Sequence, residues 1–562
     1  MEFFRKNRNL IIISIFVLFI AYMPFMNNFL LWGHDIVFHL GRIEGLAVSL
    51  SNGDFFARIN PVVNGYGYAS GIMYPQLFLY IPAILRLLGF SLMDAYKIFI
   101  FLINAATFAI ACLSFKNILH LTENYIAMLA GAFYVLGLYR LSSVYLRAAL
   151  GEVLGIAFLP LLLWGMYELF VGEGKKWWVA VIGWTCVLQS HILTTEIALV
   201  FSILFFFVEI KRICCEKRIL LIVKAIVLTA LLNAFFIIPF IHYFVSCDFQ
   251  LFHAGEGGLA MTAVYFSQMF SSVVTNRGSM IGLGTTAGEM PVSIGTISLI
   301  TLFGYVILRV NTANKLYRIG DRVFLLVVLI LFAVSDLCPW GVLWRFPYLN
   351  RLVSSIQFLC RLFSTAYLFL TIIFVIILCT LKNYVKKPII ILAALILIWG
   401  NCWYYIESTV QTERVMSEDE TGRTASADGL YMYNDFSDLE NLNARGEKIE
   451  LIPADSGISI GEYRKQGAEM SFEVSDSDGS AVDLEIPLYY YPTYRAQLNN
   501  EDLEIEQGTD GVIRLKNVSR NGTVKVWFPE QPLWLAADII SFCTVLSCIM
   551  IIVRKKWIKR TL

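Results

Sequence analysis

The sequence predicts a polytopic α-helical membrane protein of about 12 spans, followed by a sandwich-like β domain outside the cytoplasm. The composition is the first reason: apolar residues are 57% and charged residues 15% of the 562 residues, and the mean hydropathy is +0.66. A soluble protein of ordinary composition has about 25% charged residues. The second reason is a series of long apolar runs, and the third is an abrupt change to acidic, alternating sequence near the C-terminus.

The apolar runs approach the ~20 residues that a spanning helix needs. They predict spans at 10–31, 93–115, 124–138, 148–170, 177–190, 195–210, 219–244, 291–309, 323–338, 362–381, 388–405 and 533–553. The apolar segment 76–89 is short and contains Pro82 and Arg86. Counting it as a span would invert the topology of everything that follows, so we expect a re-entrant or interfacial piece of the first outer loop. No small-residue cleavage motif follows the first run, which therefore predicts a signal anchor.

Basic residues indicate the orientation. With the N-terminus inside, the seven inner segments together carry 22 Lys and Arg. The outer segments, apart from the C-terminal domain, carry only about ten over a longer total length, which is the positive-inside pattern. We therefore expect a multi-pass protein of the cell membrane with both termini in the cytoplasm.

The expected domains are a membrane domain at 1–405, whose first outer loop is 32–92, an outer β domain at 406–532, and a last span with a basic tail at 533–562. The β domain holds 25 of the 43 acidic but 11 of the 44 basic residues, so its net charge is −14. Its predicted strands alternate apolar and polar residues and are separated by turn signals such as Asn499-Asn500 and Asn521-Gly522. The eleven cysteines show no metal-ligand spacing.

The most informative segment is Trp32–Glu44, directly after the first apolar run. In a helix over 35–50, Asp35, His39 and Arg42 share one stripe, because each residue turns about 100°. Glu44 then points to the opposite side. Ionisable groups on one stripe beside a membrane are costly to bury and indicate a functional site. The alternative is an amphipathic interfacial helix with a solvated polar face.

Several short motifs, together with the order of spans and β domain, carry a resemblance to a known family. They are His34-Asp35-x-x-Phe38-His39-x-x-Arg42, Gly65 to Pro75, Arg147 to Glu152 with Leu159-Pro160, Ser190-His191, Gln357 to Arg361, and Pro487 to Tyr494. On these residues the chain resembles the GT-C superfamily of membrane glycosyltransferases. More narrowly, it resembles bacterial YfhO-like proteins, which overlap the group labelled "6-pyruvoyl-tetrahydropterin synthase related domain; membrane protein". Nothing in the chain looks like a soluble pterin enzyme.

The resemblance implies transfer of a sugar from a polyprenyl-phosphate donor to a cell-envelope acceptor (wall polymer, glycolipid or protein) on the outer face. The general base is implied to be Asp35, the acidic residue of the first outer loop. Many GT-C proteins show two neighbouring acidic residues there, sometimes with a divalent metal. This chain departs from that pattern, since Asp35 has no acidic neighbour before Glu44, which puts a metal site in doubt. The expected partners are the donor, the acceptor and the bilayer, with no nucleic acid.

For Asp35 the functional interpretation is a base that takes the proton of the acceptor hydroxyl; the alternative is a helix N-cap. His34 and His39 are candidates to orient Asp35, to contact the donor or to bind metal. A metal held by these three residues alone is disfavoured, because side chains at successive helix positions diverge.

Arginines near the outer face are the candidates for holding the donor phosphate, since positive charge stabilises a departing phosphate. The chosen residues are Arg42, Arg147 and Arg361, with Gln357 on the face of Arg361 at a helical spacing of four; Arg58, Arg345 and Arg351 are substitutes. The alternative is snorkelling of each arginine to the lipid headgroups.

Glu152, His191 and Tyr74 are assigned to the walls of the same cavity. An intramembrane Glu needs a partner or a role, and Arg147 lies close by in sequence. A polar-capped turn is the alternative for His191. The 251–290 loop, with its glycines at 255–258 and 282–284, is a candidate lid.

A second class of function fits the same features: a non-enzymatic carrier or flippase of a lipid-linked envelope intermediate. It also needs phosphate-binding arginines but has no need for a base at Asp35. A third interpretation, in which the β domain binds wall polymer and the spans only anchor it, ranks last because an anchor does not require so many spans.

Overall fold

The computed structural model describes residues 2–62, 65–247, 249, 259–272, 292–310, 315–412, 415–424, 458–476, 481–519 and 521–561. The chain forms two compact units. Unit 1 comprises 1–36, 96–229 and 254–418, and unit 2 comprises 37–95, 230–253 and 419–562. This division differs from the order along the chain, because most of the first outer loop belongs to the same unit as the β domain.

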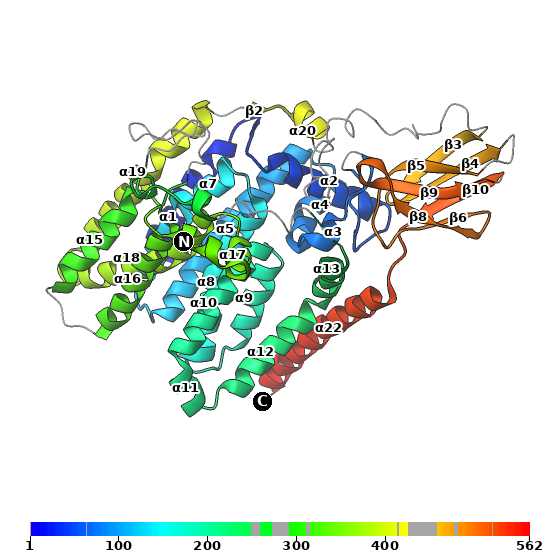
Figure 1. Ribbon diagram of the computed structural model, residues 1–562. Coiled ribbons are helices and arrows are strands. Elements are labelled where there is room, and N and C mark those ends of the chain that lie inside the picture. Colours follow the sequence, from blue (N-terminus) through cyan, green and yellow to red (C-terminus); the bar gives the residue numbers. More distant parts are fainter. Residues whose placement is uncertain are drawn as a thin grey trace. The chain divides into compact units, whose positions relative to one another are not determined.

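Unit 1 is helical (Figure 1). Its helices, some of which extend into unit 2 at one end, are α1 (Glu2–Tyr22), η1 (Met23–Phe25), α5 (Leu92–Ile118), α6 (Asn124–Val135), α7 (Leu138–Tyr145), α8 (Leu150–Phe170), α9 (Trp178–Leu188), α10 (Ile192–Val208), α11 (Ile210–Cys215), α12 (Ile219–Leu232), η5 (Leu259–Thr262), α14 (Phe266–Met269), α15 (Thr296–Val310), α16 (Lys315–Val334), η6 (Trp340–Arg345), α17 (Pro347–Ser354), η7 (Leu359–Arg361), α18 (Leu362–Leu381) and α19 (Lys387–Thr412).

Long apolar helices make this a multi-pass membrane protein. Within the described residues, 5 helices are long and apolar enough to cross a membrane, or up to 7 if the bent pairs α6–α7 and α12–α13 each form one span. Shorter apolar helices lie at four further predicted spans, in α1, α9, α10 and α15. The total of about 12 spans, counted by the ~20-residue criterion, stays a prediction.

Close packing in unit 1 relies on aromatic and small residues. α18 contacts α6, α15 and α16, and Phe133 of α6 stacks on Phe374 of α18 with ring centroids 4.4 Å apart. α8 and α9 approach closely where glycines face the opposite backbone: a Cβ on Gly165 would overlap Ala180. Without water to drive association, membrane helices depend on this kind of close contact.

A short two-stranded sheet joins distant parts of unit 1. β1 (Leu30–Leu31) pairs antiparallel with β2 (Val415–Met416), so Leu30 lies opposite Met416. β1 follows the first apolar helix and β2 follows α19. The pairing brings the ends of these two segments together, while the orientation of the chain in the membrane stays a prediction.

Unit 2 contains the β region and the helices around it. Its helices are α2 (Ile36–Ser51), α3 (Ser70–Met73), η3 (Leu77–Leu79), α4 (Tyr80–Leu87), α13 (Ala234–Ser246), α20 (Glu418–Thr424), η8 (Thr509–Gly511) and α22 (Pro532–Thr561). Its strands are β3 (Ile458–Gln466), β4 (Glu469–Asp476), β5 (Val482–Tyr489), β6 (Arg495–Leu498), β7 (Glu501–Leu503), β8 (Ile505–Gln507), β9 (Val512–Val518) and β10 (Gly522–Trp527). In Figure 1, α22 runs beside α13, and the two helices are in contact.

The predicted antiparallel β region is confirmed. The strands form a five-stranded sheet in the order β3-β4-β10-β6-β7 and a three-stranded sheet in the order β5-β9-β8. The alternating sequence marked β4, β5, β9 and β10 correctly. The turn at Asn499 and Asn500, between β6 and β7, has positive φ values of 52° and 70°, which asparagine tolerates better than most residues.

Tyrosines connect the first outer loop to the β domain within one hydrophobic core. Tyr66, Tyr68, Tyr489 and Tyr491 are all at most 2% exposed. The backbone N–H of Tyr489 donates to the carbonyl of Tyr66 at 3.0 Å, and the Tyr491 hydroxyl accepts from the N–H of Ala69 at 2.9 Å. The tyrosine-rich segments quoted for the family resemblance are thus core packing.

The helix predicted over 35–50 is confirmed, with its start at Ile36. The segment 76–89 contains η3 and α4, and α4 has 8 residues. At 1.5 Å per residue such a helix extends about 12 Å, which is too short to cross a bilayer core of about 30 Å.

Candidate functional site

Asp35 lies in a tight turn that rests on a second turn of unit 1. The N–H of His34 donates to the carbonyl of Leu146 at 3.0 Å, and the N–H of Asp35 donates to the carbonyl of Arg147 at 2.8 Å. Gly33 permits this contact, since a Cβ there would overlap Ala148. Two segments more than 100 residues apart in sequence are thereby held backbone to backbone, with Asp35 beside Arg147.

The Asp35 carboxylate is available for chemistry. It accepts no hydrogen bond from any residue that the structure describes, so the N-cap alternative has no hydrogen bond to support it. The residue remains exposed to solvent, yet surrounding protein desolvates it enough to raise its pKa above the usual value, while Arg147, His34 and Arg361 partly offset that rise. The carboxylate is therefore a better proton acceptor than a free aspartate, while the neighbouring cations favour its ionised form.

A buried network in unit 1 that includes Arg147 is centred on Glu152. Arg147 Nη1 lies 2.8 Å from Glu152 Oε2, and Arg361 Nε lies 3.8 Å from the same oxygen. The Tyr139 hydroxyl donates to Glu152 Oε1 and accepts from Arg147 at 3.2 Å. These four residues are between 1% and 8% exposed. With two guanidinium groups and one carboxylate, the network has a net charge of about +1.

Gln357 and Arg361 are together, but not as predicted. The sequence placed them on one face of a helix. In the structure α17 ends at Ser354, and Gln357 has a φ of 63° in the turn before η7. The left-handed turn brings the Gln357 amide oxygen to accept from Arg361 Nη1 at 2.9 Å, and the carbonyl of Ile356 accepts from the same atom at 2.6 Å. The helical spacing was wrong because sequence spacing does not reveal a break in the helix.

His191 caps a helix. It is the N-cap of α10, where its Nδ1 accepts from the N–H of Thr194 at 3.3 Å and lies 2.8 Å from the Thr194 hydroxyl. This is the polar-capped turn that the sequence offered as the alternative, although Glu152 interacts electrostatically with His191. His191 therefore has a structural role, and a role in the site remains a prediction.

His39, Arg42 and Tyr74 belong to unit 2 and form an aromatic and cationic cluster there. Arg42 is 3% exposed and lies over the Tyr74 ring, 4.1 Å from its centroid. Its Nη2 donates to the carbonyl of Pro75 at 2.5 Å. Glu44 points elsewhere, as expected, and forms a two-pronged ion pair with Arg86 at 2.7 and 3.1 Å.

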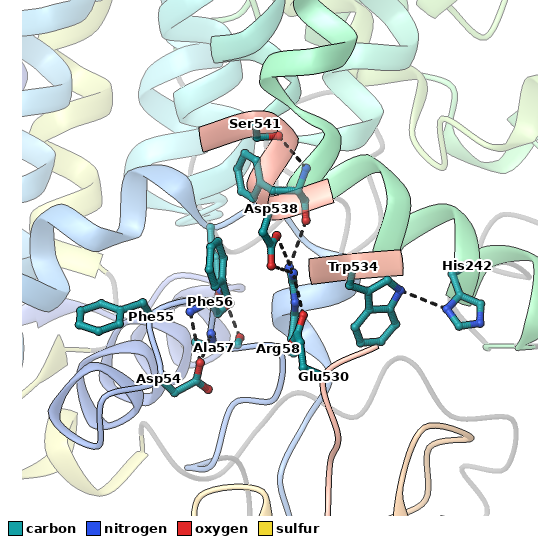
Figure 2. A network of polar contacts seen from close by, with 12 residues as sticks. Asp54, Phe55, Phe56, Ala57, Arg58, His242, Glu530, Trp534, Asp538 and Ser541 are labelled. Atoms are coloured by element: carbon teal, nitrogen blue, oxygen red, sulfur yellow. Dashed lines mark hydrogen bonds and ion pairs between the residues drawn. The ribbon is translucent and has the colours of Figure 1, made fainter. Parts of the chain in front are cut away.

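Arg58, a substitute candidate for the phosphate, is committed to another network in unit 2 (Figure 2). Its Nη2 lies 2.8 and 2.9 Å from the two carboxylate oxygens of Asp538 and 3.5 Å from Glu530. Its Nη1 donates to the carbonyl of Phe235 at 3.1 Å. The other substitutes, Arg345 and Arg351, are exposed.

Sequence reasoning missed two partners. Tyr139 had no signal beyond being a tyrosine close to Arg147. Asp538 had one that was overlooked, since it is an acidic residue inside the last apolar run, where a charge needs a partner.

The described residues contain no cluster of protein ligands for a divalent metal. Among them, no group of three or more His, Cys, Asp and Glu side chains is placed to hold an ion. Glu152, the carboxylate of the buried network, lies against the guanidinium groups of Arg147 and Arg361. The proposed lid glycines at 255–258 and 282–284 lie outside the described residues.

Comparisons with known proteins give distant similarities. No model of a known protein family matches the chain. An uncharacterized protein of Lactococcus lactis is 27% identical over 255 residues, which cover 42% of this chain and 40% of that protein. The chain thus matches less than half the length of this relative.

Among solved structures, the apo form of the oligosaccharyltransferase of Archaeoglobus fulgidus is similar with a TM-score of 0.36 and 11% identity. The alignment covers 81% of this chain and 61% of that one.

Proposed function

We propose that this protein is a membrane glycosyltransferase of the GT-C kind, which transfers a sugar from a polyprenyl-phosphate donor to an acceptor of the cell envelope. One observation carries the proposal. An accessible Asp35 carboxylate without a hydrogen-bond donor is held by backbone contacts beside Arg147, whose guanidinium belongs to a buried network of net positive charge. A base next to an anion-stabilising group is what this transfer needs.

The chemistry assigns a role to each part. The acceptor hydroxyl attacks the anomeric carbon as the bond from that carbon to the phosphate oxygen breaks. Asp35 takes the hydroxyl proton, and the bonding electrons leave with the lipid phosphate. Arg147 and Arg361 stabilise the charge that grows on this phosphate, and Gln357 holds Arg361. His34, next to Asp35, supports its ionised form.

His39, Arg42 and Tyr74 lie in unit 2, and the roles that the sequence assigned to them stay predictions. No step is assigned to a metal.

The assay that tests this proposal uses the purified protein in lipid vesicles with a labelled polyprenyl-phosphate sugar and an envelope extract as acceptor. Transfer of label out of the lipid fraction supports the enzyme. The rival proposal, a carrier or flippase, expects the donor to move between leaflets with its sugar intact. Donor movement without transfer would therefore replace the glycosyltransferase by the carrier.

The orientation belongs to the same proposal, with the β domain outside and both termini in the cytoplasm. A cysteine introduced at the exposed Gln507 is expected to react with an impermeant maleimide on intact cells that lack an outer membrane. The native pair Cys214 and Cys215, also exposed, lies in a predicted inner segment and provides the control. These two are expected to react only after lysis, and the reverse pattern would invert the topology.

Arg361→Gln is expected to weaken use of the donor more than use of the acceptor. Loss of a hydrogen bond to a charged group costs about 1.5–3 kcal/mol, which corresponds to roughly 10- to 150-fold. The loss appears as a higher KM for the donor if the contact is equal in the ground and transition states, and as a lower kcat if it forms as the phosphate leaves.

The matched control for this variant is Arg318→Gln, at an exposed arginine of α16, which is expected to leave both parameters unchanged. Normal donor kinetics with a lower amount of protein in the membrane would make Arg361 a structural residue.

A further inference from the structure

A helix of the first outer loop exposes an apolar stripe that no described residue of unit 2 covers. Leu77, Ile81, Ile84 and Leu88 follow one another at steps of four, three and four residues, and they are 41%, 42%, 49% and 69% exposed. The opposite side of η3 and α4 is packed, with Leu79, Pro82 and Ala83 buried. With this spacing, the exposed apolar side chains lie along one face of the helix, and the buried side chains lie on the opposite face.

Two further exposed apolar residues lie close to the start of this segment. Phe55 and Phe56 are 68% and 43% exposed. Their backbone is tied to the start of the same helical segment, because the Tyr80 hydroxyl donates to the carbonyl of Phe55 and the Gln76 amide donates to the carbonyl of Phe56 at 3.1 Å. We call these six apolar residues the loop surface: Phe55, Phe56, Leu77, Ile81, Ile84 and Leu88.

The Arg58 network places the loop surface along a membrane helix. Arg58 follows Phe55 and Phe56 closely in sequence. Its guanidinium donates two hydrogen bonds to the carboxylate of Asp538. The Phe55 side chain points away from these contacts (Figure 2). Asp538 is the seventh residue of α22, about 9 Å along the helix at 1.5 Å per residue. Arg58 therefore lies at the level of the first two turns of α22.

α22 identifies what surrounds that level. It is one of the helices long and apolar enough to span a membrane, and Leu535, Ile539 and Phe542, close to Asp538, are between 51% and 63% exposed. Exposed apolar side chains on a spanning helix face lipid. In the sequence, Leu88 of the loop surface is followed after a few residues by α5, which is also long and apolar enough to span a membrane.

We propose that the loop surface is inserted in the interfacial region of the bilayer, where its occupant is the acyl chains of ordinary membrane phospholipid. Amphipathic helices bury their apolar face about 5–10 Å into the boundary between headgroups and chains. The ion pair of Arg86 with Glu44 neutralises the charge at the end of α4 that would oppose insertion. This inference does not depend on any catalytic activity.

The test is photocrosslinking of the full chain in nanodiscs of phosphatidylglycerol and phosphatidylcholine without polyprenyl lipid. The photoreactive residue p-benzoylphenylalanine is placed singly at position 55, at position 84, or at the control position 507, where Gln507 is exposed on β8 of the same unit. Mass spectrometry then counts phospholipid adducts. Adducts at 55 and 84 are expected to exceed those at 507 by at least about tenfold, since burial of a large apolar side chain is favoured by at least this factor.

Other outcomes overturn the proposal. Equal, low adduct yields at all three positions would leave the loop surface in water. Crosslinks between two protein chains at 55 or 84 would make it an interface between copies. Adducts that arise only after polyprenyl phosphate is added would assign the surface to that lipid alone. Because positions 55 and 84 lie on separate segments, one badly folded variant does not remove the test.

Discussion

Asp35→Asn is expected to lower sugar transfer by about 10²–10⁴, the usual contribution of a general base. The amide keeps the size of the side chain but cannot accept the proton of the acceptor hydroxyl. The turn that holds Asp35 is made by backbone hydrogen bonds to Leu146 and Arg147, so the variant is expected to fold and insert normally. The measurement is the initial rate of transfer in vesicles at saturating donor.

The matched control for this base is Asp94→Asn. Asp94 is an exposed aspartate at the start of α5 and has no place in the proposed chemistry. It is expected to transfer at the wild-type rate. If Asp35→Asn also stays within a few-fold of wild type, Asp35 is not the base and the catalytic assignment fails.

The pH dependence of transfer offers a further check on Asp35. Burial raises the pKa of its carboxyl above the usual value, despite the neighbouring cations. A base works only when deprotonated. The rate of transfer is therefore expected to be highest above this raised pKa and to fall as the pH drops through it. Asp35→Asn is expected to lose this acidic limb, and its persistence in the variant would assign the limb to another group.

Glu152→Gln is expected to destabilise the folded protein by about 3–5 kcal/mol, the usual effect of removing one partner from a buried ion pair. Without the carboxylate, Arg147 and Arg361 lose the buried counter-charge that now lies within 4 Å of both. The measurement is unfolding of the detergent-solubilised protein by sodium dodecyl sulfate, followed by circular dichroism.

Two further variants separate burial from charge. Glu173→Gln removes an acidic residue that forms an exposed ion pair with Lys175; the Glu173 side chain is 74% exposed and that of Lys175 is 82% exposed. This variant is expected to have little effect on stability. The double variant Glu152→Gln with Arg147→Gln is expected to recover part of the loss, because one uncompensated cation is gone. If Glu152→Gln unfolds like wild type, the network does not stabilise unit 1.

Local sequence patterns were sufficient to predict those features of the fold that depend on residues close together in the sequence. The apolar runs, the helix after Asp35, the positive-φ asparagines near 500 and the strands with alternating residues all follow from periodicity and turn chemistry. The failure at Gln357 has the same origin: a spacing of four residues indicates one helix face only if the helix is continuous, and here it breaks after Ser354.

The sequence by itself determined that this is a multi-pass membrane protein with a C-terminal antiparallel β region, because hydropathy and alternation are properties of short segments. It also singled out Asp35, Arg147, Glu152 and Arg361, because charged groups in apolar surroundings stand out. Only the tertiary structure decided that Arg147 and Arg361 share Glu152, and that Arg58 binds Asp538, 480 residues away. Such pairings depend on how distant segments pack together, and no local periodicity encodes them.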